Sequence, residues 1–303
     1  MSDTGSIRRR TLLLGAGGVA VVGVAGALSI EAGLIPGRTT LHQLLGLNGE
    51  SGEVPDVEPG PSTRGDFVSD ARLGVSCGWT IAYPPGAEVG DPLPVLVVLH
   101  GYSNDNRAAF ERLGLDRFLA DAVAGGAAPF AIASVDGGDT YWHRRASGED
   151  AGAMVTEEFL PLLAEHGLAT DRIALLGWSM GGYGALLLAT ELGPGRVASV
   201  VAESPAMWQD AAHSPGGAFD DATDYAARDL AGRQGALAGI PVRIDCGTGD
   251  GFSPVVERYV AGFDDSPAGG FEPGGHDFAY WKRMAPAQLA FVAEHFTATK
   301  ARG

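Results

Sequence analysis

Basic residues are scarce in this chain of 303 residues. It carries 21 lysines and arginines against 37 aspartates and glutamates, which gives a net charge of −16. The only cluster of basic residues is Arg8, Arg9 and Arg10, close to the N-terminus. Proteins that bind nucleic acid present a basic patch or stripe to the phosphates. The shortage of basic residues therefore argues against a nucleic-acid partner, and the acidic surface itself identifies no substrate.

Cysteine is rarer still, since only Cys77 and Cys246 occur. No CxxC or HExxH spacing is present, and such spacings are typical of zinc sites. The sequence therefore predicts neither a metal nor another cofactor.

Residues 1–28 have the pattern of an export signal. Three arginines precede Thr11-Leu12-Leu13 and an apolar run, rich in glycine and alanine, that extends to about Leu28. A charged segment before an apolar one is typical of a signal peptide, and paired arginines favour the twin-arginine translocase (Tat) as export partner. We expect cleavage near Ala25-Gly26-Ala27 and a protein that is secreted, periplasmic or associated with the cell envelope. An uncleaved anchor is the alternative, although a run of about 17 residues is short for spanning a bilayer.

Residues 29–64 predict a linker or N-terminal arm, because they are rich in glycine, proline, serine and acidic residues. One apolar patch, residues 41–47, predicts a helix that lies on the protein body or on a membrane surface. Packing into the core is the commoner meaning of such a patch. Peripheral association with the membrane or the cell wall is therefore a further expectation.

The remaining chain, residues 65–300, alternates between strand-like and helix-like patterns. This alternation predicts a single α/β domain with a mostly parallel twisted sheet of about eight strands and helices on both faces. We expect the first two strands to form an antiparallel hairpin. No insertion is long enough for a large cap domain, although residues 204–221 could form part of a small lid. The predicted strands are 67–72, 75–83, 94–100, 129–135, 172–178, 197–203, 240–246 and 268–272, and the predicted helices are 107–124, 150–166, 180–192, 223–238, 254–263 and 279–297.

The most informative segment is residues 177–181, Gly-Trp-Ser-Met-Gly, which matches G-x-S-x-G around Ser179. Residues 172–178 predict a buried strand, and residues 182–192 predict a helix directly behind the motif. A serine on a tight turn between a strand and a helix is exposed at a helix N-terminus, and the glycines give the strained turn room. The motif alone is common in a chain with 46 glycines, but this context indicates a nucleophilic serine.

A nucleophilic serine of this kind needs a histidine that follows it along the chain. His276 lies in a glycine-rich loop just before the last predicted helix, where a flexible turn can bring an imidazole over the sheet. His295 lies inside that helix and is expected to be a surface or packing residue. His213 lies in a loop rich in proline and glycine and could lie at the rim of the active site.

The carboxylate partner is best assigned to Asp250, which follows the predicted strand 240–246. Active-site groups of open α/β sheets gather at the carboxyl ends of the strands. Asp245 is the rival, but it lies within the strand, where its buried charge would need a partner.

The expected chemistry follows from these assignments. His276 takes the proton of Ser179 as the serine attacks an ester carbonyl, and Asp250 fixes the imidazole tautomer. An acyl-enzyme forms, and water releases it. The backbone N–H groups of Met180 and Tyr102 are the expected oxyanion donors, and losing one donor costs on the order of 3 kcal/mol. His100, at the end of a strand, is expected to hold its loop by hydrogen bonds.

Four motifs resemble the putative-esterase group of α/β-hydrolases: residues 179–186 (SMGGYGAL), His100-Gly101, Gly247-x-x-Asp250 and Gly275-His276-Asp277. This group contains esterase D, feruloyl and acetylxylan esterases and the antigen 85 mycolyltransferases. The resemblance covers roughly residues 65–297 and implies the α/β-hydrolase fold, the same catalytic residues and the same oxyanion donors. In the group's usual sheet order the strands of Cys77 and Cys246 lie far apart, so two free, buried thiols are expected.

The resemblance and the leader together imply an exported serine carboxylesterase of actinobacterial type. We expect it to act on small to medium acyl esters of small molecules, lipids or carbohydrates. Two features depart from members of the group: the mycolyltransferases use a glutamate as the acid, and a cytosolic role in formylglutathione detoxification fits poorly with export. Acyl transfer to a sugar or lipid alcohol is the alternative, and a non-catalytic surface binding module is a third reading against which the complete triad argues.

Aromatic residues in two loops at strand ends are candidates for the substrate pocket. Tyr141 and Trp142 follow the fourth predicted strand, and Trp208 follows the sixth. Such side chains can line a slot for an acyl or aromatic group, or they can serve in packing. Phe252, next to Asp250, is expected to be structural.

Overall fold

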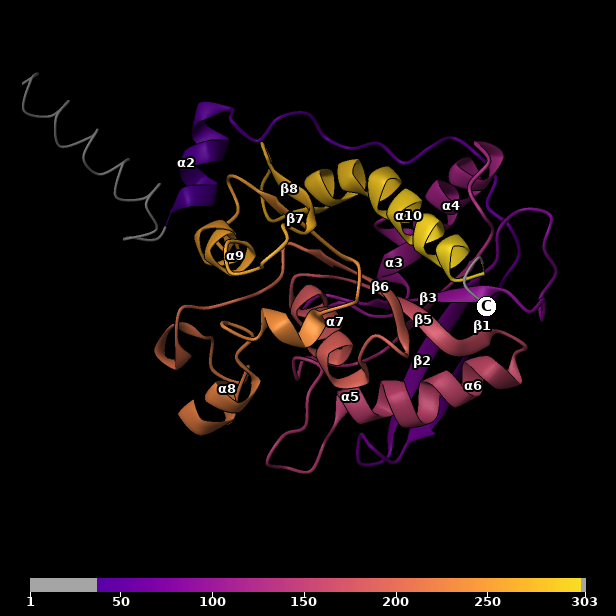
Figure 1. Ribbon diagram of the computed structural model, residues 1–303, viewed down its shortest axis with the longest axis horizontal. Helices are drawn as coiled ribbons and strands as arrows, with labels where there is room; N and C mark the ends of the chain where they lie inside the picture. Colours follow the sequence, from indigo (N-terminus) through magenta and orange to yellow (C-terminus); the bar gives the residue numbers. More distant parts are fainter. Residues whose placement is uncertain (1–36, 301–303) are drawn as a thin grey trace, which may run out of the picture.

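The computed structural model describes residues 37–300, with side chains up to residue 297. The predicted leader lies outside these residues. The described chain forms one sheet of eight strands in the order β1-β2-β4-β3-β5-β6-β7-β8 (Figure 1). The strands are β1 Ser62–Ser69, β2 Val75–Ala82, β3 Pro94–Leu99, β4 Ala131–Val135, β5 Ala169–Trp178, β6 Val197–Glu203, β7 Val242–Gly247 and β8 Ala268–Glu272.

The pairing of the strands confirms the predicted mostly parallel sheet. β1 pairs antiparallel with β2, and β2 pairs antiparallel with β4. The other six strands, β3 to β8, are parallel to one another. β4 and β6 are buried along their whole length, as expected of parallel strands that carry helices on both faces. β1 begins at Ser62, earlier than predicted, and its residues are mostly exposed or half-buried because it is an edge strand.

Helices cover both faces of the sheet (Figure 1). One face packs against α3 Ala108–Glu111, α4 Leu115–Ala124 and α10 Phe278–Lys300, around Phe118, Leu289 and Val292. The other face packs against α7 Met180–Leu192, α9 Ser253–Val260 and a continuous helix over residues 151–165. That helix consists of α5 Ala151–Ala153, a π-helical turn Met154–Phe159 and α6 Leu160–Glu165.

Two predicted helices are interrupted. Residues 107–124 divide into α3 and α4 because Gly114 takes a left-handed conformation with φ 73°. A Cβ on Gly114 would lie 2.5 Å from the side chain of Val54, so the N-terminal arm also requires glycine here. Residues 223–238 divide into α8 Ala222–Arg228 and a short 3₁₀ turn, Gln234–Leu237, on either side of Gly232 with φ 74°.

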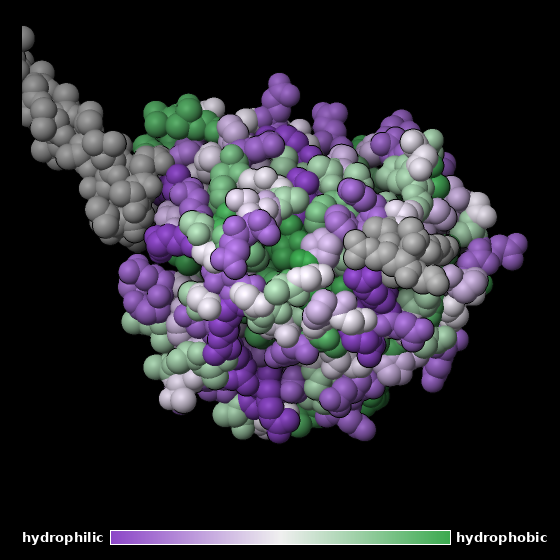
Figure 2. Space-filling view, in the orientation of Figure 1, coloured by the Kyte–Doolittle hydropathy of each residue, from purple (hydrophilic) through white to green (hydrophobic). Residues whose placement is uncertain are grey.

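The apolar patch of the N-terminal arm forms α2 Arg38–Leu45, but packing into the core is wrong for its leucines. Leu44 and Leu45 are 80% and 60% exposed, and only His42 of this helix is buried. Figure 2 shows apolar surface at the place where Figure 1 has α2. Within the described residues, no helix has the length and apolarity needed to cross a membrane.

The rest of the arm packs against two loops at the carboxyl ends of the strands. A Cβ on Gly249 would lie 2.5 Å from the side-chain oxygen of Asn48, and the Gly52 N–H donates to the Ala279 carbonyl at 2.7 Å. Arg283 donates hydrogen bonds to the carbonyls of both Glu50 and Pro273. The arm therefore supports the segments that carry Asp250 and His276.

Candidate active site

Ser179 lies on the turn between β5 and α7 with φ 56° and ψ −119°. A positive φ is strained for a residue other than glycine, and such strain is typical of functional turns. The turn leaves no room for side chains around it. A Cβ on Gly177 would lie 2.1 Å from the Gly181 carbonyl oxygen, and a Cβ on Gly181 would lie 1.9 Å from the Leu99 carbonyl oxygen. The sequence motif is therefore a steric requirement of this turn.

The structure brings Ser179, His276 and Asp250 together in one chain of hydrogen bonds. His276 Nε2 lies 2.8 Å from the Ser179 hydroxyl, and His276 Nδ1 lies 2.7 Å from Asp250 Oδ2. The Asp250 side chain is fully buried, whereas the imidazole is 26% exposed. The other Asp250 oxygen accepts the Phe252 N–H at 2.9 Å. The imidazole can therefore take the hydroxyl proton while the carboxylate holds its Nδ1–H.

Asp245, the rival carboxylate, takes part in a different set of contacts. It is 2% exposed and accepts hydrogen bonds from Arg243 Nε and Nη2, at 2.8 and 2.9 Å, and from Gln288 Nε2 at 2.9 Å. Burial raises the pKa of Asp245 against the opposing effect of Arg243. Asp245 thus has the partner that a buried strand charge needs, and His276 bonds to Asp250 instead.

The loop after β3 lies directly against the serine turn. A Cβ on Gly101 would lie 2.7 Å from the Trp178 ring nitrogen, and a Cβ on Gly181 would lie 2.7 Å from the His100 carbonyl oxygen. Met180 is the first residue of α7, where a backbone N–H has no partner within its helix. Tyr102 follows Gly101, and its side chain is 56% exposed. Both predicted oxyanion donors therefore belong to segments that meet at the serine.

His100 connects two of the loops at this edge of the sheet. The ring is fully buried, Nε2 accepts the Gly137 N–H at 3.0 Å, and Nδ1 lies 2.8 Å from the Gly101 carbonyl oxygen. Burial lowers the pKa of His100 and keeps the ring neutral. The hydrogen-bonding role expected of His100 is confirmed.

An aromatic wall extends from the catalytic histidine to the loop after β3. We define this wall by ring contacts with centroids 5.2–6.4 Å apart that link, in order, His276, Phe252, Trp208, Tyr141 and Tyr102. Burial raises the pKa of Tyr141 to about 12, so its phenol stays neutral. Phe219 contacts both Tyr141 and Trp208. Phe252, expected to be structural, touches the His276 ring, and Phe219 lies in a loop that offered no local pattern to identify it.

Trp142 does not line a pocket, and that prediction is wrong. The residue is 1% exposed, and its indole N–H donates to the His100 carbonyl at 3.3 Å. A Cβ on Gly137 or Gly184 would lie 2.2 or 2.6 Å from its ring. Trp142 therefore fills the space between the loop after β4 and α7.

His213, His295 and both cysteines take no part in the chain of hydrogen bonds at Ser179. His213 is exposed and pairs with Asp210 at 2.7 Å. His295 packs on Phe291 one turn away in α10. Cys77 and Cys246 are free and buried, and within residues 37–297 no group of three His, Cys, Asp or Glu side chains could hold a metal ion.

One buried acid beneath the serine was not anticipated. Glu203 ends β6 and is 1% exposed, and its carbonyl accepts the Ser179 N–H at 2.9 Å. Burial, reinforced by Asp245, raises the pKa of Glu203 well above its ordinary value. Its Oε1 has no hydrogen-bond partner among the described residues.

A family model described as "Putative esterase" matches residues 71–292. The chain belongs to this family. Membership in the putative esterase family makes the protein a carboxylesterase-type hydrolase. A search of curated proteins finds no match to the chain.

Solved structures agree with the family in fold. A ferulic acid esterase is 22% identical with a TM-score of 0.66, covering 78% of this chain and 99% of its own. An S-formylglutathione hydrolase from Agrobacterium tumefaciens is 18% identical with a TM-score of 0.66, covering 82% and 99%. A fluorophosphonate-binding serine hydrolase from Staphylococcus aureus is 18% identical with a TM-score of 0.61, covering 78% and 99%. The α/β-hydrolase fold is confirmed.

Proposed function

We propose that this esterase is an exported serine carboxylesterase that works through Ser179, His276 and Asp250. The observation that carries the proposal is the chain of hydrogen bonds of 2.8 and 2.7 Å that joins the three side chains at a strained serine turn. His276 accepts the Ser179 proton during attack on the ester carbonyl, and the N–H groups of Met180 and Tyr102 receive the developing oxyanion. The protonated imidazole then protonates the leaving alcohol, and water, activated by His276, releases the acid.

Esters with a small to medium acyl group or an aromatic acyl group are the proposed substrates. The aromatic wall supports this choice, because flat rings such as Trp208 and Phe252 beside His276 offer a face on which an aryl or alkyl group packs. The ferulic acid esterase among the similar structures is named for an aromatic ester. The 18% identical S-formylglutathione hydrolase is named for a small acyl group.

A panel of esters tests both the substrate class and the reaction. The purified enzyme is assayed with acetyl to dodecanoyl esters and with methyl ferulate, each with and without a sugar acceptor. We expect the highest kcat/KM with short, medium or aromatic acyl groups, and free acid as the product even when the sugar is present. Acylated sugar as the main product would assign the enzyme to acyl transfer instead, and turnover confined to the longest chains would contradict the proposed substrate.

Export through the twin-arginine translocase is part of the same proposal. Arg8 and Arg9 before the apolar run support it. Mass spectrometry of secreted protein is expected to find an N-terminus close to Leu28. Intact Met1 in the membrane fraction would favour the uncleaved anchor.

A further inference from the structure

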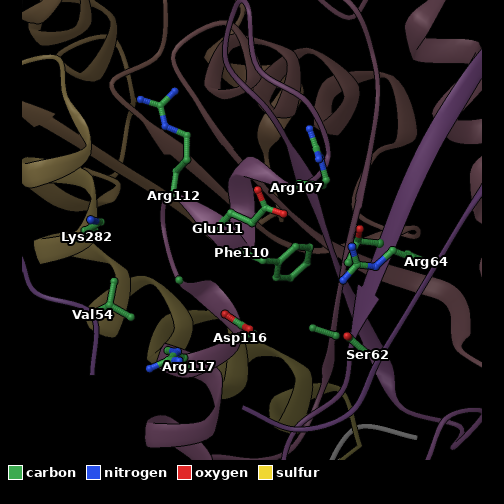
Figure 3. Close-up of a pocket in the computed structure, with 13 residues that line it drawn as sticks. Val54, Ser62, Arg64, Arg107, Phe110, Glu111, Arg112, Asp116, Arg117 and Lys282 are labelled. Atoms are coloured by element: carbon green, nitrogen blue, oxygen red, sulfur yellow. The ribbon is translucent and has the colours of Figure 1, made fainter. Parts of the chain in front are cut away.

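A pocket of about 520 Å³ opens between β1, β2, α3, α4 and the N-terminal arm. Its lining includes Arg64 from β1, Phe110 from α3 and Lys282 from α10, and none of Ser179, His276 and Asp250 belongs to it. Figure 3 shows Arg64 on one side of the pocket and Lys282 and Arg117 on the other, with Phe110 and Asp116 between them in this view. The volume lies within the range typical of sites for small molecules.

Positive charge is concentrated in this pocket. Its lining includes five of the chain's 21 lysines and arginines (Arg64, Arg107, Arg112, Arg117 and Lys282) and two acids, Glu111 and Asp116. A net positive concavity on a chain of net charge −16 is a local reversal of the protein's field. A pocket whose lining carries a net positive charge attracts anionic ligands.

Two of the five cations are already engaged. Arg107 pairs with Asp105 at 2.7 Å, and Arg112 lies over the Phe278 ring at 3.9 Å and donates to Asn104. Among the described residues, by contrast, no carboxylate lies within 4.0 Å of the charged groups of Arg64, Arg117 or Lys282. These three cations can therefore bind an anion without breaking an existing ion pair.

The other lining groups suit a ligand that also carries hydroxyl groups. Asp116 belongs to the lining of the pocket and is half-buried. A carboxylate accepts hydrogen bonds from hydroxyl groups. Phe110, also half-buried, presents a ring against which the apolar face of a sugar can pack.

We propose that this pocket is a second binding site, separate from the ester site, for a sugar that carries a phosphate or carboxylate group. Arg64, Arg117 and Lys282 bind the anionic group, Asp116 accepts from a sugar hydroxyl, and Phe110 packs against the ring. The site is also linked to the loop after β3, because Asn104 accepts from Arg112 at 3.1 Å and donates to the Tyr102 carbonyl at 2.8 Å.

Isothermal titration calorimetry on the purified enzyme tests the proposal with four probes: glucose 6-phosphate, glucuronate, glucose and inorganic phosphate. We expect glucose 6-phosphate, glucuronate or both to bind, and the tighter of the two identifies the anionic group that the site prefers. Glucose and inorganic phosphate are expected to bind at least tenfold more weakly. Arg64→Gln and Arg117→Gln are each expected to raise Kd about tenfold while ester hydrolysis is retained, which shows that the variants fold. Arg258→Gln, on an exposed residue of α9, is the matched control and should leave Kd unchanged.

Three results would overturn the proposal. The first is that neither anionic sugar binds. The second is that inorganic phosphate binds as tightly as the sugars, because the sugar then contributes nothing. The third is that Arg258→Gln weakens binding as much as the two pocket variants, because the attraction is then only the general charge of the protein.

Discussion

Asp250 and Asp245 are both buried acids near the serine, and exchanging each for asparagine separates catalysis from stability. In Asp250→Asn the amide can no longer hold Nδ1–H of His276 in the tautomer that leaves Nε2 free to accept the Ser179 proton. The expected loss in kcat is about 10⁴-fold, or about 5 kcal/mol of transition-state stabilisation. The cost in stability is on the order of 1 kcal/mol, for one weakened hydrogen bond from the Phe252 N–H.

In Asp245→Asn we expect a loss of folding stability, with activity retained. Three donor groups from Arg243 and Gln288 converge on the two Asp245 oxygens, and an asparagine offers only one oxygen and turns an NH₂ group toward donors. Removing one partner of a buried ion pair costs about 3–5 kcal/mol. The lower end applies, because Arg243 is 16% exposed and can reach water. About 3 kcal/mol corresponds to a fall in Tm of about 6–12 °C for a domain of this size.

Both variants are assayed for kcat with a soluble aryl ester and for Tm by calorimetry at pH 7. The expected pattern is an inactive but stable Asp250→Asn and an active but destabilised Asp245→Asn. A thousandfold loss of kcat in Asp245→Asn at unchanged Tm, with Asp250→Asn still active, would instead make Asp245 the catalytic acid.

Three further changes test the packing and charge of the site. Gly181→Ala places a Cβ 1.9 Å from the Leu99 carbonyl oxygen and should cost at least about 3 kcal/mol of stability in a urea titration. Gly216→Ala, with open space around it, is the control and should leave stability unchanged. Equal losses of stability in the two variants would contradict the steric explanation. Trp142→Ala should cost about 3–5 kcal/mol of stability because the ring is buried. Trp208→Ala should change KM for aryl esters and leave Tm within a few degrees of the wild type. The reverse pattern would show that Trp142, and not Trp208, contacts the substrate. Glu203 has a folded pKa raised above 4.5, so its contribution to stability is present below pH 4.5 and is lost as the pH rises through the folded pKa. Glu203→Gln should therefore raise Tm at about pH 8 by several degrees, at about 2–4 °C per kcal/mol. This gain in Tm should vanish below pH 4.5. A gain in Tm that is the same at both pH values would argue against an ionisation effect.

The sequence predicts best what local geometry determines. The serine turn could be recognised because Gly177 and Gly181 are fixed by contacts within the turn and with the adjoining strand. His276 and Asp250 follow strands in the chain order that this chemistry requires, so their positions were also predictable. All three depend on short segments at the carboxyl ends of parallel strands.

Residues placed by contacts distant in the chain were not predictable in the same way. Trp142 and Tyr141 are adjacent in sequence, both have φ near 60° and both are buried. Trp142 nevertheless packs against His100 and α7, whereas Tyr141 contacts Trp208 and Tyr102 in the aromatic wall. Phe219 reaches the same wall from a loop without periodic pattern. Whether an apolar patch is buried depends on the surface that it meets. Leu44 and Leu45 of α2 remain exposed, although such a patch more often packs into the core.

Ser179 is proposed as the nucleophile of this esterase. Intact-mass spectrometry after treatment with a fluorophosphonate tests this proposal most directly, with wild-type protein, Ser179→Ala and, as a matched control, Ser204→Ala on the neighbouring loop. We expect one adduct on the wild type and on Ser204→Ala, mapped by peptide sequencing to Ser179, and no adduct on Ser179→Ala. Labelling of Ser179→Ala to the same extent as the wild type would contradict this proposal.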